Sequence, residues 1–152
     1  MRRAVTLLLS AAALGAALVT GRATAAPART QTGAKVQLRS TSVGTILVNG
    51  RGFTLYMFAK DTRNHNACVA IKGCSAIWPA LLTSGKPVAA SGVKASLLGT
   101  IKLSGGQQQV TYAGRPLYTY VGDTRPGSTS YVGLRQSGGA WYALGAAGNI
   151  VK

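Results

Sequence analysis

Short apolar and β-branched runs alternate with glycine-containing turns along the chain from residue 41 onwards. The runs "VGTILV" (43–48) and "FTLYMF" (53–58) flank Asn49-Gly50, a dipeptide that favours a tight β-hairpin turn. In "LYMF" the alternation of side chains leaves both faces apolar. This pattern predicts a strand covered on both sides, in which the hydroxyl of Tyr56 needs a hydrogen-bond partner.

The second half of the chain has the same design. The strand candidates "TIKL", "QQVTY" and "LYTY" are separated by the turns "SGG" and "AGR", and we expect "AWYAL" and "NIVK" to be the last strands. The segments "CSAIWPALL" and "KASLLG" each predict a short helical turn, limited by Pro79 and ended by Gly99 respectively. The predicted fold class is therefore mainly β, a small antiparallel domain with one or two short helical turns.

An internal repeat relates the two halves. Residues 52–63, "GFTLYMFAKDTR", align without a gap with residues 114–125, "GRPLYTYVGDTR". Further along, Trp78 and Trp141 each begin a W-x-A-L stretch. A unit of this size cannot bury a small sheet alone, so we expect the two copies to share one core. The matched motif positions are Tyr56 and Tyr118, Phe58 and Tyr120, Asp61 and Asp123, and Arg63 and Arg125.

The first 25 residues are typical of an export signal, with Arg2 and Arg3 before an apolar run and small residues up to Ala25. The run is shorter than a membrane span needs, which predicts an extracytoplasmic, secreted product without a transmembrane segment. The first cysteine is Cys68, so the end of the signal has no cysteine for a lipid anchor.

The organisation of the remaining chain follows from composition. Residues 26–40 are polar and contain proline and glycine, which predicts a flexible lead-in. Residues 41–152 form the predicted domain, with two repeats at about 41–82 and about 96–152 joined by a loop at 83–95.

Charge narrows the choice of partner. The chain has seventeen Lys and Arg against two acidic residues, a net charge of +15; without residues 1–25 it has fourteen against two, or +12. Such a field favours anionic partners, namely teichoic acids, acidic lipid headgroups, acidic polysaccharides or nucleic acid. The bases form no run and no specific nucleic-acid motif, so a merely solvated surface is the alternative. Nothing in the sequence specifies an oligomeric state.

The two rare carboxylates are the first candidates for chemistry. Asp61 and Asp123 each follow a strand candidate and precede Thr-Arg, a pattern that predicts a turn in which the carboxylate accepts backbone N–H groups and pairs with Arg63 or Arg125. The alternative is a hydrolase that uses the two aspartates as acid and base. Neighbouring arginines favour the ionised form of both groups, and a duplication makes them alike, whereas such chemistry needs two unlike carboxyls.

The cysteines and the histidine offer two further sites. Cys68 and Cys74 are the only cysteines of a chain with an export signal, which predicts a disulfide; a redox-associated role is the alternative, although it usually uses the closer C-x-x-C spacing. His65 precedes Cys68 by three residues, but the acids, His65 and the cysteines have no metal-site spacing. We therefore expect no metal and no cofactor.

The aromatic residues favour a core, with one exposed cluster as a possible stacking platform for sugars or bases. These residues are Tyr56, Phe58, Trp78, Tyr112, Tyr118, Tyr120, Tyr131, Trp141 and Tyr142.

Taken together, the motifs resemble a bacterial secreted-repeat family, often labelled predicted lipoproteins. Its mark is Tyr-x-aromatic-x-x-Asp in two copies, here "YMFAKD" (56–61) and "YTYVGD" (118–123), with paired cysteines before Trp78-Pro79 and a "GGAWYAL" close. The chain departs from the family in lacking the lipid-attachment cysteine and in the wider spacing of its cysteines. The resemblance implies fold and compartment but no activity. The expected function is that of a non-catalytic β-repeat protein of the cell envelope or extracellular space that binds anionic polymers.

Overall fold

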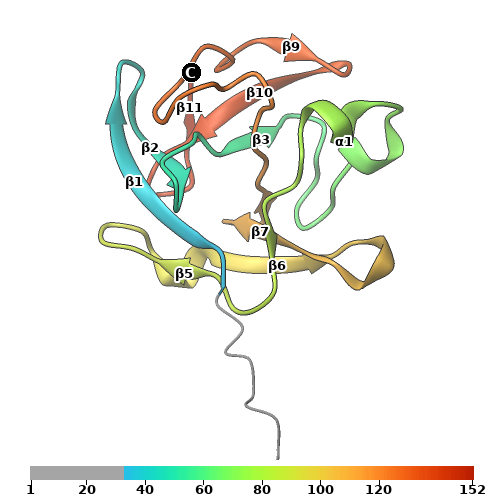
Figure 1. Ribbon diagram of the computed structural model, residues 1–152, viewed down its shortest axis with the longest axis horizontal. Coiled ribbons are helices and arrows are strands. Elements are labelled where there is room, and N and C mark those ends of the chain that lie inside the picture. Colours follow the sequence, from blue (N-terminus) through green and yellow to red (C-terminus); the bar gives the residue numbers. More distant parts are fainter. Residues whose placement is uncertain (1–32) are drawn as a thin grey trace, which may run out of the picture.

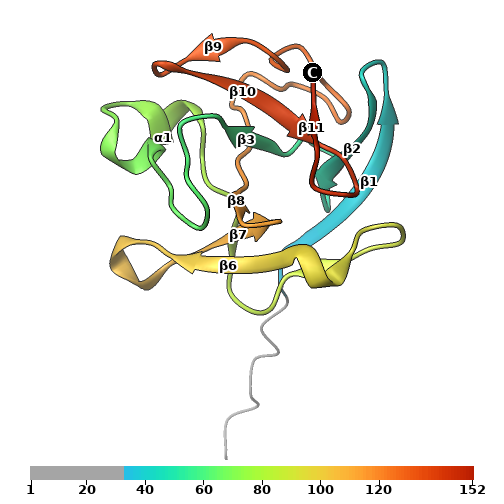
Figure 2. The same cartoon turned by 180° about the vertical axis from the view of Figure 1, so that it is seen from behind.

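The computed structural model describes residues 33–152, which form a mainly β structure of short strands, as the sequence predicts. The predicted export signal, 1–25, and the first part of the predicted lead-in lie outside the described residues. Within the described part of the chain, all strand pairs are antiparallel except one, which joins β1 (Lys35–Thr41) to β5 (Val88–Ala89). Figures 1 and 2 show β10 (Gly139–Leu144) along one side of the molecule, β6 (Leu98–Lys102) along the opposite side and β3 (Tyr56–Phe58) between them.

The first sheet has the order β2-β1-β5 and is built on a hairpin that begins earlier than the sequence predicts. β1 (Lys35–Thr41) pairs with β2 (Gly44–Asn49), and β5 (Val88–Ala89) lies parallel to the start of β1. The assignment of 26–40 to a flexible lead-in is therefore wrong for residues 35–40. β1 is largely polar because it has a single fully buried side chain, that of Val36, and the composition alone resembles a loop.

The predicted hairpin around Asn49-Gly50 is present, but its turn is longer than two residues and its ladder is short. The side-chain oxygen of Asn49 accepts the backbone N–H groups of Arg51 and Phe53, which holds residues 50–52 in a bend. The N–H of Asn49 donates to the carbonyl oxygen of Phe53 and that of Leu55 to Leu47, with a bridge between Val48 and Thr54. The strand after the bend, β3 (Tyr56–Phe58), belongs to another sheet.

The second sheet has the order β11-β10-β3, with β9 also paired to β10. β10 (Gly139–Leu144) contains the W-x-A-L stretch of the second repeat and pairs with β3 of the first, so that Trp141 lies opposite Phe58. β11 (Ile150–Val151) and β9 (Arg135–Gln136) complete it. The two last strands predicted from "AWYAL" and "NIVK" are thus confirmed.

The third sheet has the order β4-β7-β6, with β8 also paired to β7. Its members are β4 (Leu82–Thr83), β6 (Leu98–Lys102), β7 (Gln108–Tyr112) and β8 (Arg115–Pro116). The strand predicted at "LYTY", 117–120, is wrong. This segment forms no ladder and is bridged at Tyr118 alone, to Tyr56 and to Ala80. The loop predicted at 83–95 contains β5 and the end of β4.

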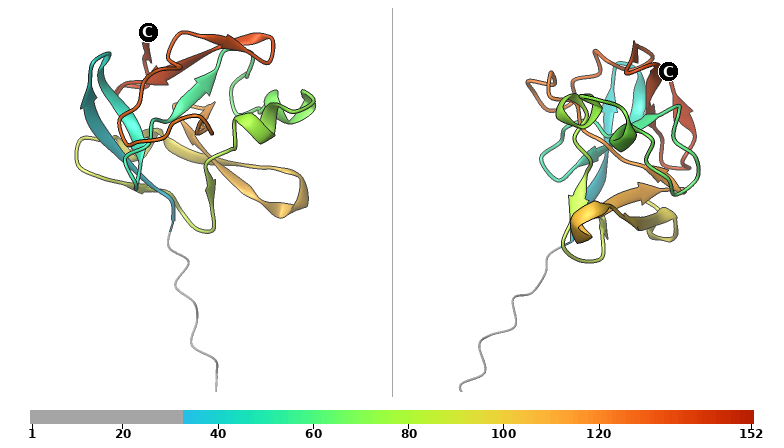
Figure 3. Two further views of the ribbon diagram at one scale, coloured as in Figure 1. Left: turned by 45° about the horizontal axis from the view of Figure 1, so that its top comes forward. Right: turned by 90° about the vertical axis from the view of Figure 1, so that its right-hand side faces the viewer.

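Between residues 33 and 152, helical structure is limited to single turns. α1 (Cys74–Ile77) ends one residue before Trp78, and 3-10 turns cover Cys68–Ala70, Ala95–Leu97 and Ser104–Gly106. The turns predicted from "CSAIWPALL" and "KASLLG" are both present. The left view of Figure 3 shows β3 between the β1–β2 hairpin on one side and α1 on the other.

The core joins the two repeats. One buried cluster contains Leu47 and Met57 from the first repeat with Val110 and Leu144 from the second. Another contains Tyr56 and Trp78 with Tyr118 and Trp141. All three side chains of β3 are buried, as its two apolar faces predict. Neither repeat therefore has a core of its own.

Candidate functional site

The two copies of the motif meet at their tyrosines. The N–H of Tyr56 donates to the carbonyl oxygen of Tyr118 and the N–H of Tyr118 donates to that of Tyr56, each over 2.9 Å. The flanking bonds obey the same local two-fold relation, because Ala59 donates to Ala140 just as Val121 donates to Ile77. Each motif segment thus lies beside the W-x-A-L stretch of the other repeat.

The tyrosine and aspartate side chains are exchanged between the copies. The hydroxyl of Tyr118 donates to Oδ2 of Asp61 over 2.8 Å. The hydroxyl of Tyr56 donates to the carboxylate of Asp123, at 3.1 Å from Oδ2 and 3.3 Å from Oδ1. Each motif therefore supplies the donor for the other motif's carboxylate. We call the pairs Tyr118–Asp61 and Tyr56–Asp123 the crossed pairs.

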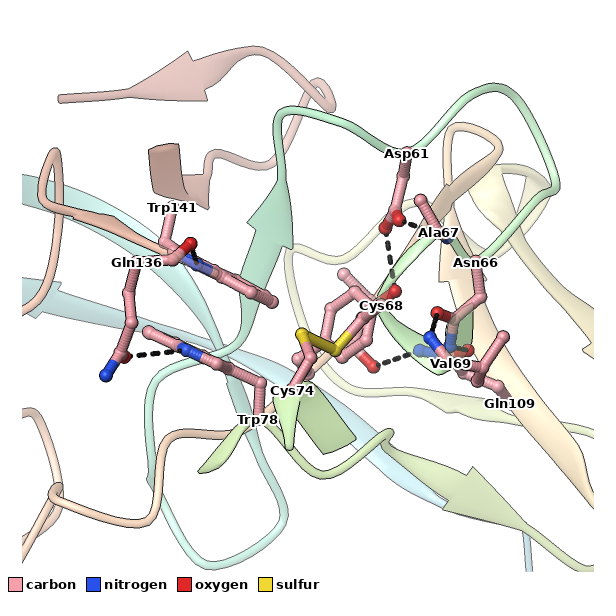
Figure 4. The surroundings of a disulfide bond; sticks show 12 residues. Asp61, Asn66, Ala67, Cys68, Val69, Cys74, Trp78, Gln109, Gln136 and Trp141 are labelled. Carbon is pink, nitrogen blue, oxygen red and sulfur yellow. Dashed lines mark hydrogen bonds between the residues drawn. A yellow bond between two sulfur atoms is a disulfide. The ribbon is translucent and has the colours of Figure 1, made fainter. Parts of the chain in front are cut away.

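The two aspartates lie in equivalent turns, one in each repeat. The N–H of Asp61 donates to the carbonyl oxygen of Phe58 over 3.1 Å, and the N–H of Asp123 to that of Tyr120 over 3.2 Å. Oδ1 of Asp61 also accepts the N–H of Ala67 over 2.8 Å, which fastens the loop that leads to the first cysteine (Figure 4). A carboxylate at this position satisfies buried donors in both repeats.

The arginines that follow the aspartates do not form the ion pairs predicted for them. Arg63 donates from its guanidinium to the carbonyl oxygen of Ala113, 3.4 Å away, rather than pairing with Asp61, and Arg125 is exposed. The carboxylates accept hydrogen bonds from neutral tyrosine hydroxyls instead of pairing with these cations.

Burial controls the titration of the crossed pairs. It raises the pKa of Asp61 to about 6, against the opposing effects of the Ala67 N–H, the Tyr118 hydroxyl and His65. The pKa of Asp123, whose side chain is 8% exposed, is raised by burial as well. Burial, and then the neighbouring carboxylate, also raise the pKa of both tyrosines well above the ordinary value. The expectation that nearby cations lower the carboxyl pKa is therefore wrong.

An aromatic stack adjoins the crossed pairs. The indoles of Trp78 and Trp141 lie parallel, with ring centroids 3.8 Å apart and 4° between planes. Phe58 stacks on the far side of Trp141, and Tyr120 on Trp78, at 4.2 and 4.5 Å. The expected exposed cluster is not present among these rings, because both indoles are fully buried and Tyr120 is half-buried.

One glutamine, which no motif of the sequence marks, accepts hydrogen bonds from both indoles. Gln136 accepts the Nε1–H of Trp78 on its side-chain oxygen over 2.9 Å and that of Trp141 on its backbone oxygen over 3.0 Å. Figure 4 shows the two parallel rings beside Gln136. A second unexpected pair is Asn66 and Gln109, both buried and joined over 2.7 Å.

The disulfide lies at the edge of this stack. Cys68 and Cys74 are fully buried and joined to each other, and their Cα atoms are 5.4 Å apart. Both sulfurs pack in the same cluster as Trp78. Within residues 33–152 no group of three or more His, Cys, Asp and Glu could hold a metal ion.

A pocket opens beside one carboxylate. It has a volume of about 190 Å³ and lies between the Asp61 turn and the turn that joins β7 to β8. Its walls include Asp61, Thr62, Arg63 and Arg115, with the backbone of Gly114. Asp123 is held in its own turn by Tyr56, so the structure does not bring the two carboxylates to this pocket together.

Comparison with known proteins identifies a family but no individual relative. No curated protein and no solved structure matches the chain. A family model described as a secreted repeat of unknown function matches twice, at residues 38–82 and 99–144. These two matches contain the two halves of the crossed pairs, and both W-x-A-L stretches lie within them. The chain therefore belongs to this family of secreted repeats of unknown function.

Proposed function

We propose that the protein is a non-catalytic, extracytoplasmic binding protein for anionic polymers of the cell envelope or its surroundings. One observation carries the proposal: within residues 33–152, every largely exposed charged side chain is basic. Twelve of the thirteen Lys and Arg in this range are exposed, whereas Asp123 is buried and Asp61 is half-buried. The charged surface is thus almost purely cationic, and it attracts polyanions whose bound counterions it can release.

The inward position of the carboxylates strengthens this argument. A basic protein often keeps acidic side chains on its surface, where they shorten the reach of its positive field. Here both acids accept hydrogen bonds from tyrosines instead. No helix in residues 33–152 is long and apolar enough to cross a membrane.

The crossed pairs favour binding over the hydrolase alternative. An acid and base acting on one bond need two carboxyls on either side of it. Asp61 and Asp123 lie in separate turns with separate tyrosine partners, and Asp61 is the one that lines the 190 Å³ pocket. The redox alternative receives no support from the buried position of Cys68 and Cys74.

The experiment uses the purified mature chain, by which we mean residues 26–152 without the predicted export signal. Its binding to polyglycerol phosphate, an acidic polysaccharide, anionic vesicles and duplex DNA is measured, each at two salt concentrations. We expect saturable binding to at least one of these polymers, with log K falling linearly with log salt. A neutral polysaccharide is the control ligand. Absence of binding at low salt, or affinity unchanged by salt, would contradict the proposal.

A further inference from the structure

The pocket beside Asp61 has two arginines in its walls, and one of them packs against a glycine. Gly114 has a φ of 76°, and a Cβ built on it would come within 2.9 Å of Cγ of Arg63. The arginine side chain therefore lies directly over the peptide of Gly114. One of its guanidinium N–H groups is used on the carbonyl of Ala113, which leaves the other donors for a ligand.

Arg115 provides the second cation, on the opposite repeat from Arg63. It is half-buried, in contrast to the other twelve basic residues of the described chain, and it belongs to β8, which pairs with the buried strand β7. Two arginines in the walls of one small cavity suit an oxyanion, since each guanidinium can form a fork of parallel N–H bonds. The bond to Ala113 restrains Arg63 before a ligand binds, which reduces the side-chain entropy lost on binding.

Asp61 sets the charge of the cavity. Asp61 lines the pocket together with Arg63 and Arg115. Its carboxylate accepts a hydrogen bond from the hydroxyl of Tyr118, and His65 acts to lower its pKa. Burial raises the pKa of this carboxyl to about 6. Below that pH the cavity has two cations and a neutral carboxyl group, which can itself donate a hydrogen bond. Above it, the carboxylate repels an incoming anion.

The equivalent place in the other half is built differently. At the repeat offset, the counterpart of Arg115 is Phe53, and the guanidinium over the matching glycine, Gly52, comes from Arg39. The counterpart of Asp61 is the more deeply buried Asp123. The duplication therefore gives Arg63 and Asp61 matched control positions in Arg125 and Asp123.

We propose that the cavity between the Asp61 turn and the β7–β8 turn binds one oxyanion group, a phosphate or a carboxylate, between Arg63 and Arg115. This inference deepens the proposed function, because it names the place where one anionic group of the polymer is held. It also gives Asp61 a role beyond its turn: the carboxyl group tunes the affinity of the cavity with pH.

The experiment is an NMR titration of ¹⁵N-labelled mature chain with two small probes, glycerol 3-phosphate and glucuronate, below and above the pKa of Asp61. We expect saturable shifts of the amides of Asn64, Gly114 and Arg115 with at least one probe. Glucuronate, which stays ionised over this interval, should bind more tightly at the lower pH, whereas glycerol 3-phosphate itself loses charge at about pH 6 and is compared between wild type and Asp61→Asn at one pH. Saturation by the phosphate alone, or by the carboxylate alone, identifies which oxyanion the cavity prefers. Arg63→Gln and Arg115→Gln should each weaken binding about tenfold, whereas Arg125→Gln, the repeat counterpart of Arg63, should leave it unchanged.

The aspartate variants give the sharper test. Asp61→Asn should bind the probe more tightly at neutral pH and remove the pH dependence due to this carboxyl, while Asp123→Asn should retain it. Equal losses in Arg63→Gln and Arg125→Gln, shifts spread over the whole basic surface, or weaker binding by a folded Asp61→Asn would overturn the inference. Because the arginine variants change exposed or half-buried side chains, they test the site even if Asp61→Asn fails to fold.

Failure of this inference is distinguishable from failure of the proposed function. Polymer binding that Arg63→Gln and Arg125→Gln reduce equally refutes the cavity and retains the proposed function. Saturable probe binding at the cavity without binding of any polymer supports the cavity and refutes the proposed function.

Discussion

A buried aspartate needs a hydrogen-bond donor, and here the donor is a neutral tyrosine rather than a cation. Burying an arginine with the carboxylate would require the desolvation of two charges, whereas a phenol adds none. Tyr56 and Tyr118 lie within the aromatic core, so their rings pack among apolar side chains while their hydroxyls reach Asp123 and Asp61. This choice leaves Arg63 and Arg125 free of the carboxylates.

We predict that the crossed pairs are coupled energetically. Tyr118→Phe leaves Asp61 with one donor fewer, and should lower the free energy of unfolding by about 1 to 2 kcal/mol. Asp61→Asn, which can still accept the hydroxyl, should cost less than Asp61→Ala. Urea denaturation measures both, with the exposed Thr124→Ala as control. Additive losses in the double variant Tyr118→Phe/Asp61→Ala would show that the pair has no energetic coupling.

The raised pKa of Asp61 predicts an unusual dependence of stability on pH. Its pKa is about 6 in the folded chain against the ordinary 3.8, so the folded state binds the proton more tightly than the unfolded state. The resulting stability is complete below about pH 4 and is lost as the pH rises through 6. Wild type should therefore lose more stability over this interval than Asp61→Asn does. Asp123 acts in the same direction in both chains, so the difference between the two curves isolates Asp61. Parallel curves would contradict the prediction.

At the scale of elements, local patterns predicted which segments form strands better than they predicted strand partners. The strands β7, β10 and β11 and the turn at α1 follow from periodicity and turn residues. The partner of β3 does not, because the short hairpin after Asn49-Gly50 ends at Leu55 and β3 then pairs with β10 of the other repeat. β1 was missed because its polar face is exposed.

The same limit applies to the site. The repeat offset identifies Asp61 and Asp123 as equivalent and Trp78 and Trp141 as equivalent. It cannot say whether a tyrosine bonds the aspartate of its own motif or of the other, because a duplication allows both arrangements. Gln136 was unpredictable for another reason: its partners are Nε1 groups brought together only by tertiary packing.

The stacked indoles join elements from both repeats, and we predict a measurable coupling between them. Trp78→Phe and Trp141→Phe should each destabilise the fold, and a double-mutant cycle should give a coupling of about 0.5 to 1.5 kcal/mol. Trp78→Phe combined with Val36→Ala, which belongs to a different buried cluster, is the additive control. A coupling no larger than that of the control would contradict the observed stack.

The whole molecule is an exchange of parts between two homologous halves. Each half supplies the tyrosine for the other's aspartate, a W-x-A-L stretch that lies beside the other's motif segment, and one of the two stacked indoles. The large buried cluster likewise contains residues of both. A repeat that leaves its apolar faces and its buried carboxylate without partners cannot be stable alone.

This exchange predicts that the halves fold only together. The cleavable point is between Ser91 and Gly92, after β5, because β5 pairs with β1 of the first repeat, and both residues are exposed. A chain with a protease site inserted there should remain assembled after cleavage, with an unchanged circular dichroism spectrum and a single peak in gel filtration.

The separated fragments, 33–91 and 92–152, should each be unfolded, and mixing them should restore the spectrum with second-order kinetics. Tyr118→Phe in the second fragment should weaken reassociation, because its hydroxyl bonds Asp61 of the first, whereas Tyr142→Phe, a half-buried tyrosine outside the crossed pairs, should have little effect. A first fragment that folds without the second would show that the shared core is not required, and would remove the basis for the exchange.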